Sequence, residues 1–315
     1  MADTLMRGRD HGGGVDAAVA RFGGVRADWI DLSTGINPVP YPLTDLPADS
    51  WTALPDRAAQ TALETAARRF WRVPDGASIL AAPGASALIA RLPLLAPPGR
   101  VDIPSPTYNE HAAAFAAQNW QVAETAGEAK VVVTPNNPTG DWYGPEALTA
   151  PLMVIDESFA DITPERSLIA HAADPGHVVL KSFGKFWGLA GLRLGFAIGP
   201  ETLIARLTDM LGPWPVSGPA LSIAAAALSD FAWADATRAR LTADAARLDA
   251  LLERAGATVA GGTTLFRLYE VDDAVAWQDR LARARVWTRI FPYSKTWLRL
   301  GLPGPDAWAR LEAAL

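Results

Sequence analysis

A lysine, a carboxylate, an asparagine and an arginine stand in four short polar segments of this 315-residue chain. In order, the segments are residues 135–140 (PNNPTG), 154–159 (VIDESF), 182–185 (SFGK) and 191–195 (GLRLG). Each follows or ends a compact apolar run, which is typical of a strand buried on both faces. Ligand sites of open α/β sheets lie where such strands end, so the four segments predict one site that combines an amine with a carboxylate.

Lysine is scarce in this sequence, which makes each occurrence informative. Only four of the 28 basic residues are lysines: Lys130, Lys181, Lys185 and Lys295. Lys185 stands among glycines and aromatic residues, and an amine in such surroundings can lose its proton and act as a nucleophile. The alternative interpretation is a surface lysine in a turn.

The composition excludes several other kinds of site. Half of the residues are hydrophobic and a fifth are charged, as in ordinary globular proteins. There is no cysteine, so disulfides, thiolate metal sites and a cysteine nucleophile are excluded. The net charge of -6 argues against a nucleic-acid-binding surface, which needs a basic stripe.

The absence of several motifs excludes further kinds of chemistry. The four histidines lack the spacing of metal ligands, so no metal site is expected. No glycine-rich dinucleotide or phosphate loop, zinc-protease motif or nucleophile elbow occurs. No apolar run is long enough for a signal peptide or a membrane span. We therefore expect a cytoplasmic protein with neither a membrane nor a nucleic acid as partner.

The elements that must position these residues alternate between helix and short apolar strand. This rhythm predicts an α/β domain with a mostly parallel sheet. After about residue 213 the pattern changes to long helices and then strands, which predicts a smaller α+β domain. We expect a segment 1–34 that joins the small domain, a large domain over 35–215 and a small domain over 216–315. Strands are expected at 78–82, 101–103, 130–134, 152–155, 177–182, 194–198, 263–271, 286–290 and 296–300.

The string S-x-x-K-x-x-G-x-x-G-x-R-x-G over residues 182–195, together with N-P-T-G and D-E-x-F, resembles fold-type I pyridoxal-phosphate enzymes of the class I/II aminotransferase family. The resemblance covers nearly the whole chain. It implies the pyridoxal-phosphate-dependent transferase-like fold, with a mostly parallel central sheet sandwiched by helices and a smaller α+β domain. It also implies pyridoxal 5'-phosphate as cofactor and a homodimer with its sites near the interface.

The resemblance assigns three residues to the cofactor ring. Lys185 would form a Schiff base with the cofactor aldehyde, and Asp156 would pair with the protonated pyridine nitrogen. Asn137 would hydrogen-bond the ring hydroxyl oxygen. Asp156 taken alone is more readily explained as a helix cap, and Asn137 is also a turn former beside Pro138.

A second set would hold the remainder of the cofactor. Tyr108 matches an aromatic residue that stacks on the ring, although a lone tyrosine at a helix start usually packs. Residues 84–86 follow a strand and open a helix, an arrangement that binds anions. Ser86 is equally well explained as a simple helix cap. The resemblance assigns the phosphate contacts to Gly84, Ala85, Ser86, Ser182 and Arg193.

Four residues are candidates for substrate binding. Arg299 matches the arginine that clamps the substrate α-carboxylate, for which a planar bidentate donor is suited. Asn37 matches a loop that lines the substrate pocket, and a turn before Pro38 is the alternative. Arg289 resembles an arginine that binds a substrate phosphate, and His11 is a further candidate. Either of these two is alternatively a surface or capping residue.

Two positions depart from the family pattern. Phe159 stands where many relatives carry a tyrosine whose hydroxyl contacts the cofactor ring. Leu54, in Leu-Pro-Asp, replaces a tyrosine that in relatives reaches the cofactor phosphate of the neighbouring subunit. In both cases a contact that relatives make with the cofactor is missing, and other residues would have to replace it.

Within the family, several strings resemble the threonine-phosphate decarboxylases of cobalamin synthesis. They are residues 11–13 (HGG), 31–38 (DLSTGINP), 106–111 (PTYNEH) and 214–217 (WPVS). A pyridoxal-phosphate-dependent lyase acting on a small phosphorylated amino acid is therefore expected. A histidinol-phosphate-type aminotransferase is the alternative, because rotation of the substrate decides which bond breaks. A cofactor-binding protein without catalysis is a remote third possibility.

Overall fold

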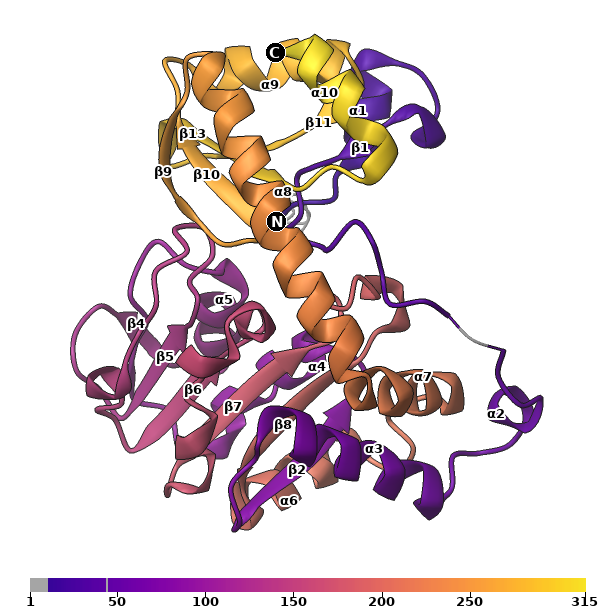
Figure 1. Ribbon diagram of the computed structural model, residues 1–315. Helices are drawn as coiled ribbons and strands as arrows, with labels where there is room; N and C mark the ends of the chain where they lie inside the picture. The colour runs from indigo at the N-terminus through magenta and orange to yellow at the C-terminus, as the bar shows by residue number, and fades with distance from the viewer. Residues whose placement is uncertain (1–10, 44) are drawn as a thin grey trace. The chain divides into compact units, whose positions relative to one another are not determined.

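The computed structural model describes residues 11–43 and 45–315, which form two compact units (Figure 1). Unit 2 is the continuous stretch Pro40–Arg240, and unit 1 combines residues 11–39 with Leu241–Leu315. The second boundary lies inside one uninterrupted helix, α8 (Phe231–Arg254). Residues 1–10 of the N-terminal segment predicted from the sequence lie outside the described residues.

The boundaries between these units differ from the predicted domain boundaries. The chain divides at 39/40 and 240/241, whereas the sequence places the divisions at 34/35 and 215/216. Helix α7 (Gly218–Ser229) accounts for much of the difference, because it packs along α3 (Arg57–Trp71) within unit 2. Apart from Gly218, Ser222 and Ser229, α7 consists of apolar residues, so its sequence does not indicate which domain receives it.

Unit 2 is built on a seven-stranded sheet. Strand β8 runs antiparallel to both of its neighbours, and the other adjacent strands are parallel. The predicted α/β fold with a mostly parallel central sheet is confirmed. The spatial order of the strands is β2 (Ala77–Ala82), β8 (Gly195–Pro200), β7 (His177–Ser182), β6 (Leu152–Asp156), β5 (Ala129–Val133), β3 (Arg100–Asp102) and β4 (Gln121–Ala123).

Helix α3 shows how the local sequence sets an element of this unit. It begins at Asp56, whose side chain accepts a hydrogen bond from the Ala59 N–H, as N-cap residues do. Its apolar stripe ends in Phe70 and Trp71, which are buried. The helix ends at Arg72 in a left-handed conformation, two residues before Pro74. The other helices are α2 (Asp49–Thr52), α4 (Ala85–Ile89), α5 (Asn109–Ala117) and α6 (Glu201–Leu211).

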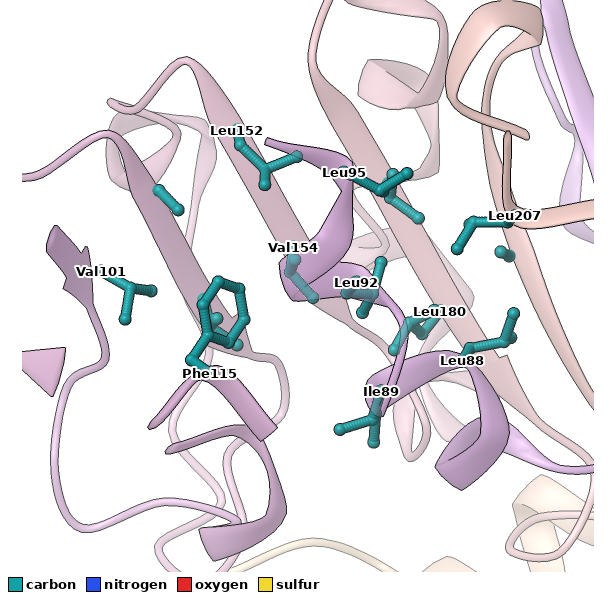
Figure 2. Packing of buried hydrophobic residues seen from close by; sticks show 14 of the residues in the cluster. Leu88, Ile89, Leu92, Leu95, Val101, Phe115, Leu152, Val154, Leu180 and Leu207 are labelled. Carbon is teal, nitrogen blue, oxygen red and sulfur yellow. The ribbon is translucent and has the colours of Figure 1, made fainter. Parts of the chain in front are cut away.

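Side chains of the central strands alternate between two cores, as the pleat requires. Val154 of β6 and Leu180 of β7 face one core with residues of α4, α5 and α6. In Figure 2, Leu88, Leu92 and Phe115 pack over this side of the sheet. The opposite side is exemplified by Phe196 of β8, whose ring lies 4.9 Å from that of Trp71 in α3.

Unit 1 contains a four-stranded sheet in the order β12-β13-β10-β9 and a two-stranded pair β1-β11. The strand expected at 263–271 is present as the shorter β10, which begins at Phe266. Strand β9 was not expected, and it ends at Gly262, whose φ of 115° suits a turn. The expected strand 286–290 is divided between two sheets at Thr288. The elements are α1 (Val15–Phe22), β1 (Ile30–Asp31), β9 (Thr258–Gly262), β10 (Phe266–Glu270), α9 (Ala274–Arg283), β11 (Val286–Trp287), β12 (Arg289–Phe291), β13 (Ser294–Gly301) and α10 (Trp308–Ala314).

Among the helices of the described residues, none is long and apolar enough to cross a membrane.

Replacement of Phe115 by Ala tests the core shown in Figure 2. Phe115 is fully buried, and its ring meets Trp120 edge-on at 5.2 Å. Removing a buried phenyl group leaves a cavity, so we expect the free energy of unfolding in urea to fall by about 3–5 kcal/mol. The exposed Val122→Ala serves as control and should change it by less than about 0.5 kcal/mol. Equal unfolding midpoints for the two variants would show that the packing of Phe115 does not determine the free energy of unfolding.

Candidate active site

A pocket of about 660 Å³, counted with its open mouth, lies in unit 2 at the carboxyl ends of β5, β6 and β7. All nine residues that the sequence assigned to the cofactor line it. Their individual roles stay predictions, but the fold brings together what the sequence spreads over 110 positions. These residues are Gly84, Ala85, Ser86, Tyr108, Asn137, Asp156, Ser182, Lys185 and Arg193.

Asp156 ends β6 and is only 2 % exposed. Its Oδ2 lies 2.8 Å from Nε2 of His111, and its Oδ1 accepts hydrogen bonds from the backbone N–H and the hydroxyl of Ser158. Burial by itself raises the pKa of Asp156, but the hydrogen bond and charge of His111 and the two bonds from Ser158 outweigh it. The pKa therefore lies below its usual value, and Asp156 is an anion at neutral pH.

His111 is a site residue that the sequence analysis missed. It is fully buried in the first turn of α5, three residues after Tyr108, and the two rings meet edge-on at 6.1 Å. The sequence indicated only that the histidines lack metal-ligand spacing. The available signal was the i, i+3 spacing from Tyr108, which places two side chains on one face of a helix start.

Lys185 lines the pocket half-buried, with its Nζ 5.3 Å from the centre of the Phe159 ring. Phe159, which lacks the hydroxyl that many relatives carry at this position, thus makes a cation–π contact with the Lys185 amine. Lys181, four residues earlier, does not line the pocket and pairs with Glu157 at 2.6 Å. The geometry thus separates the two lysines and leaves Lys185 as the candidate nucleophile.

The anion-binding part of the pocket depends on a close approach to Gly84. A Cβ at that position would lie 2.5 Å from Nη2 of Arg193, so only glycine lets the guanidinium reach the backbone here. Gly84 also has a φ of 84° and precedes the first turn of α4, whose N–H groups point outward. Gly84, Ala85, Ser86, Ser182 and Arg193 line this end of the pocket, which we call the cradle. That the cradle binds a phosphate stays a prediction.

Hydrogen bonds between two loops position Asn137 and Tyr108. The buried Asn136 accepts a bond of 2.6 Å from the Thr107 hydroxyl and donates one of 3.0 Å to the Pro106 carbonyl. The turn after β5 and the loop before α5 are thereby joined at the residues next to Asn137 and Tyr108. Asn136 therefore supports the site, while Asn137 lines it.

Unit 1 carries the four predicted substrate-binding residues. Arg299 of β13 is 5 % exposed and donates a 2.7 Å hydrogen bond to the Ser33 carbonyl. Ser33 also accepts a bond from the Gly13 N–H, so the segment after His11 runs beside it. Asn37 is buried, and its side chain accepts the Val39 N–H in a turn.

Arg289 and Arg299 are direct partners across the antiparallel strands β12 and β13. Their guanidinium carbons lie 5.4 Å and 5.9 Å from the centre of the same Phe291 ring. Arginine side chains are suited to bind carboxylate and phosphate groups. Both residues therefore stay candidates for substrate binding. Across residues 11–43 and 45–315, no group of three or more metal-ligating side chains was found.

Comparison with known families supports the assignment made from these motifs. Residues 27–309 match the model of the family described as "Aminotransferase class I and II". A "Threonine-phosphate decarboxylase" of Sinorhizobium sp is 43 % identical over 94 % of each chain. One of Pseudomonas aeruginosa is 42 % identical over 97 % of each chain. A "Histidinol-phosphate aminotransferase" of Mycobacterium bovis is 38 % identical, but over only 46 % of this chain and 42 % of its own.

A solved structure supports the fold. The histidinol-phosphate aminotransferase from Sinorhizobium meliloti, described in complex with pyridoxal-5'-phosphate, superposes with a TM-score of 0.79 at 17 % identity. The match covers 95 % of this chain and 92 % of that one. The transferase-like fold expected from the resemblance is confirmed.

The variant His111→Phe tests whether His111 keeps Asp156 ionised. It retains a ring but removes the N–H that Asp156 accepts, so burial raises the pKa of Asp156. A carboxyl group with a lowered pKa stabilises the fold above its usual pKa, and this contribution is lost as the pH falls through the folded-state value. We expect acid unfolding of the variant at higher pH, and a loss of about 1.5–3 kcal/mol near neutral pH.

His171→Phe is the matched control, since His171 pairs with Asp174 at a side chain that is 34 % exposed. Such an exposed pair contributes little, so its acid-unfolding midpoint should stay at the parent value. If His111→Phe also leaves the midpoint unchanged, His111 does not set the ionisation of Asp156.

Proposed function

Because this chain belongs to the class I and II aminotransferase family, we propose that it decarboxylates L-threonine O-3-phosphate. The products would be CO2 and (R)-1-amino-2-propanol phosphate, a precursor in cobalamin synthesis. The observation that carries the proposal is the full-length likeness to relatives named threonine-phosphate decarboxylase. Sequence likeness to the histidinol-phosphate aminotransferase of Mycobacterium bovis extends over less than half of the chain, which makes that alternative the weaker one.

The residues of the pocket fit pyridoxal 5'-phosphate. The cradle around Gly84 and Arg193 suits its phosphate, the anionic Asp156 suits a protonated pyridine nitrogen, and Lys185 suits its aldehyde. Asn137 would donate to the ring hydroxyl oxygen, and Tyr108 would cover the ring. The chemistry that this cofactor supplies when bound is an electron sink for the bond that breaks at the substrate α-carbon.

The chain's own residues then perform three tasks. Asp156 would keep a proton on the ring nitrogen, because a carboxylate with a lowered pKa is too weak a base to remove that proton. Arg299 binds the α-carboxylate and Arg289 the phosphate, which fixes the rotation of the substrate. Lys185 donates a proton to the α-carbon, which replaces the carboxylate that has left as CO2.

We further propose that the protein acts as a cytoplasmic homodimer. The exposed large apolar side chains of unit 2 include Trp51 at 71 %, Leu54 at 66 % and Trp214 at 52 %. Trp51 lies in α2, which packs against α7, and Trp214 precedes α7 in a left-handed backbone conformation. A second copy would cover this apolar surface. Leu54, which replaces a tyrosine of many relatives, would then serve contact between subunits instead of cofactor binding.

The decisive experiment offers L-threonine O-3-phosphate to the cofactor-loaded protein without any oxo acid and follows CO2. Sustained release over many turnovers is expected. Lys185→Ala should lower the rate by about a hundred- to ten-thousandfold, as loss of a proton-transferring group does. Lys130→Ala, which removes a lysine outside the pocket, should retain the rate. Glutamate formation from histidinol phosphate and 2-oxoglutarate, without CO2 release, would instead establish the aminotransferase; bound cofactor with no turnover would indicate a binding protein.

Arg289→Gln tests the assignment of the substrate phosphate. Loss of a charged hydrogen-bond donor costs about 1.5–3 kcal/mol, so KM for threonine phosphate should rise by about ten- to a hundredfold. The slow reaction of unphosphorylated L-threonine should be nearly unaffected. Arg283→Gln, at the exposed end of α9, is the control and should change neither value. Equal effects of Arg289→Gln on both substrates would remove Arg289 from the phosphate site.

A further inference from the structure

Three charged side chains of unit 2 form a buried cluster that does not line the candidate active site. Lys181 is 2 % exposed, Glu157 is 1 % and Asp161 is 5 %. Nζ of Lys181 lies 2.6 Å from Oε2 of Glu157 and 3.7 Å from Oδ1 of Asp161. Glu157 also accepts hydrogen bonds from the Ser167 hydroxyl and the Leu168 N–H. These charges are buried deeply, yet the proposed reaction does not use them.

Each charged residue on the two strand ends is a direct neighbour of a pocket residue. Glu157 follows Asp156, and Lys181 precedes Ser182. The Glu157 N–H donates to the Leu180 carbonyl at 3.0 Å, so the pairing of β6 with β7 continues past the end of β6. Neighbouring side chains of an extended strand point to opposite faces. The Glu157–Lys181 pair therefore fixes, from the far face, the strand ends that present Asp156 and Ser182.

Asp161 extends this network to the loop that carries Lys185. The indole N–H groups of Trp71 and Trp187 donate to its two carboxylate oxygens at 2.8 Å and 3.1 Å. Trp187 comes two residues after Lys185, and its ring stacks on Phe183 at 5.0 Å with an interplanar angle of 7°. The segment after Lys185 is thereby bonded to Asp161 through Trp187, and the segment before Lys185 packs on the Trp187 ring through Phe183.

Further contacts surround the same carboxylate. Burial raises the pKa of Asp161, while Lys181, the Trp71 N–H, Arg238 and the Trp187 N–H act against that rise. Arg238 also donates a 2.8 Å hydrogen bond to the Asp161 carbonyl. Asp161 is thus restrained through both its side chain and its backbone.

Stability alone is a poor explanation for such a network. Removing charges from water costs more than their attraction returns in many buried pairs, and apolar replacements of similar volume are often as stable. What apolar side chains do not supply is directional bonding. We propose that Glu157, Lys181 and Asp161 are positioning residues, which hold Asp156, Ser182 and Lys185 in productive geometry. This inference rests on the proposed pyridoxal-phosphate reaction.

The test is the double variant Glu157→Gln/Lys181→Met, which removes both charges and keeps similar volumes. Urea unfolding should show a stability close to that of the parent. Displacements of about 1 Å in a site lower rates by up to about a hundredfold, so kcat should fall by about ten- to a hundredfold with KM nearly constant. The visible circular dichroism of the bound pyridoxal phosphate should change, because it reports the orientation of the ring.

The matched control replaces the ion pair of Lys130 and Asp102, whose Nζ and Oδ2 lie 3.1 Å apart. This pair belongs to the same sheet and does not line the pocket. Lys130→Met/Asp102→Asn should keep the parent kcat and spectrum. Trp187→Phe provides a second test that keeps the stacked ring and removes only the bond to Asp161. It should reproduce the loss of kcat and the spectral change while the protein stays folded.

Parent-like kcat and circular dichroism in both the double variant and Trp187→Phe would overturn the proposal. So would a loss of activity that follows the loss of stability alone, with an unchanged cofactor spectrum in the folded fraction. The affinity for pyridoxal phosphate and the spectrum are measured without substrate. A protein that failed to release CO2 would thus refute the proposed substrate while leaving this test of the network intact.

Discussion

A buried carboxylate needs hydrogen-bond donors or a positive charge beside it, because burial removes it from water. Asp156 at the end of β6 is such a carboxylate, and the surrounding loops of the pocket have to supply these groups. The His111 ring and the Ser158 backbone and hydroxyl supply them together. His111 can do so only if the first turn of α5 lies over the end of β6. The same placement brings Tyr108 to the pocket and lets Thr107 bond Asn136. The loops of the site are thus arranged around one buried negative charge.

Side chains that line the pocket and side chains that support them lie on opposite faces of the central strands. Lys181 and Lys185 are four residues apart, yet Lys181 forms an ion pair with Glu157 away from the pocket, and Lys185 lines the pocket. The same division separates Asp156 from its neighbour Glu157. Charges on the supporting face can therefore be buried and fixed, while the groups facing the pocket keep access to a ligand.

The sequence was sufficient where residue type and spacing carry the information. The buried strands β5, β6 and β7 are continuous apolar runs, and each is followed by a polar segment of the site, so their convergence could be predicted. His111 and the Lys181–Glu157 pair gave no comparable signal, because the sheet alone brings their partners together. Register across a hairpin sets Arg289 opposite Arg299. The short edge strands β4 and β9 lack the apolar pattern that marks a buried strand.

The discontinuity of unit 1 has a consequence for how the chain is made. Ribosomes extend a chain at about 5–20 residues per second, and domains fold as they emerge. Unit 2 is contiguous and can complete its sheet while synthesis continues. Ile30 of β1, in contrast, has to wait for Val286 of β11, which is its partner in the sheet. Most of the chain is therefore synthesised before the N-terminal segment meets its native neighbour. The order of synthesis makes unit 2, which carries the candidate nucleophile Lys185, the first to fold.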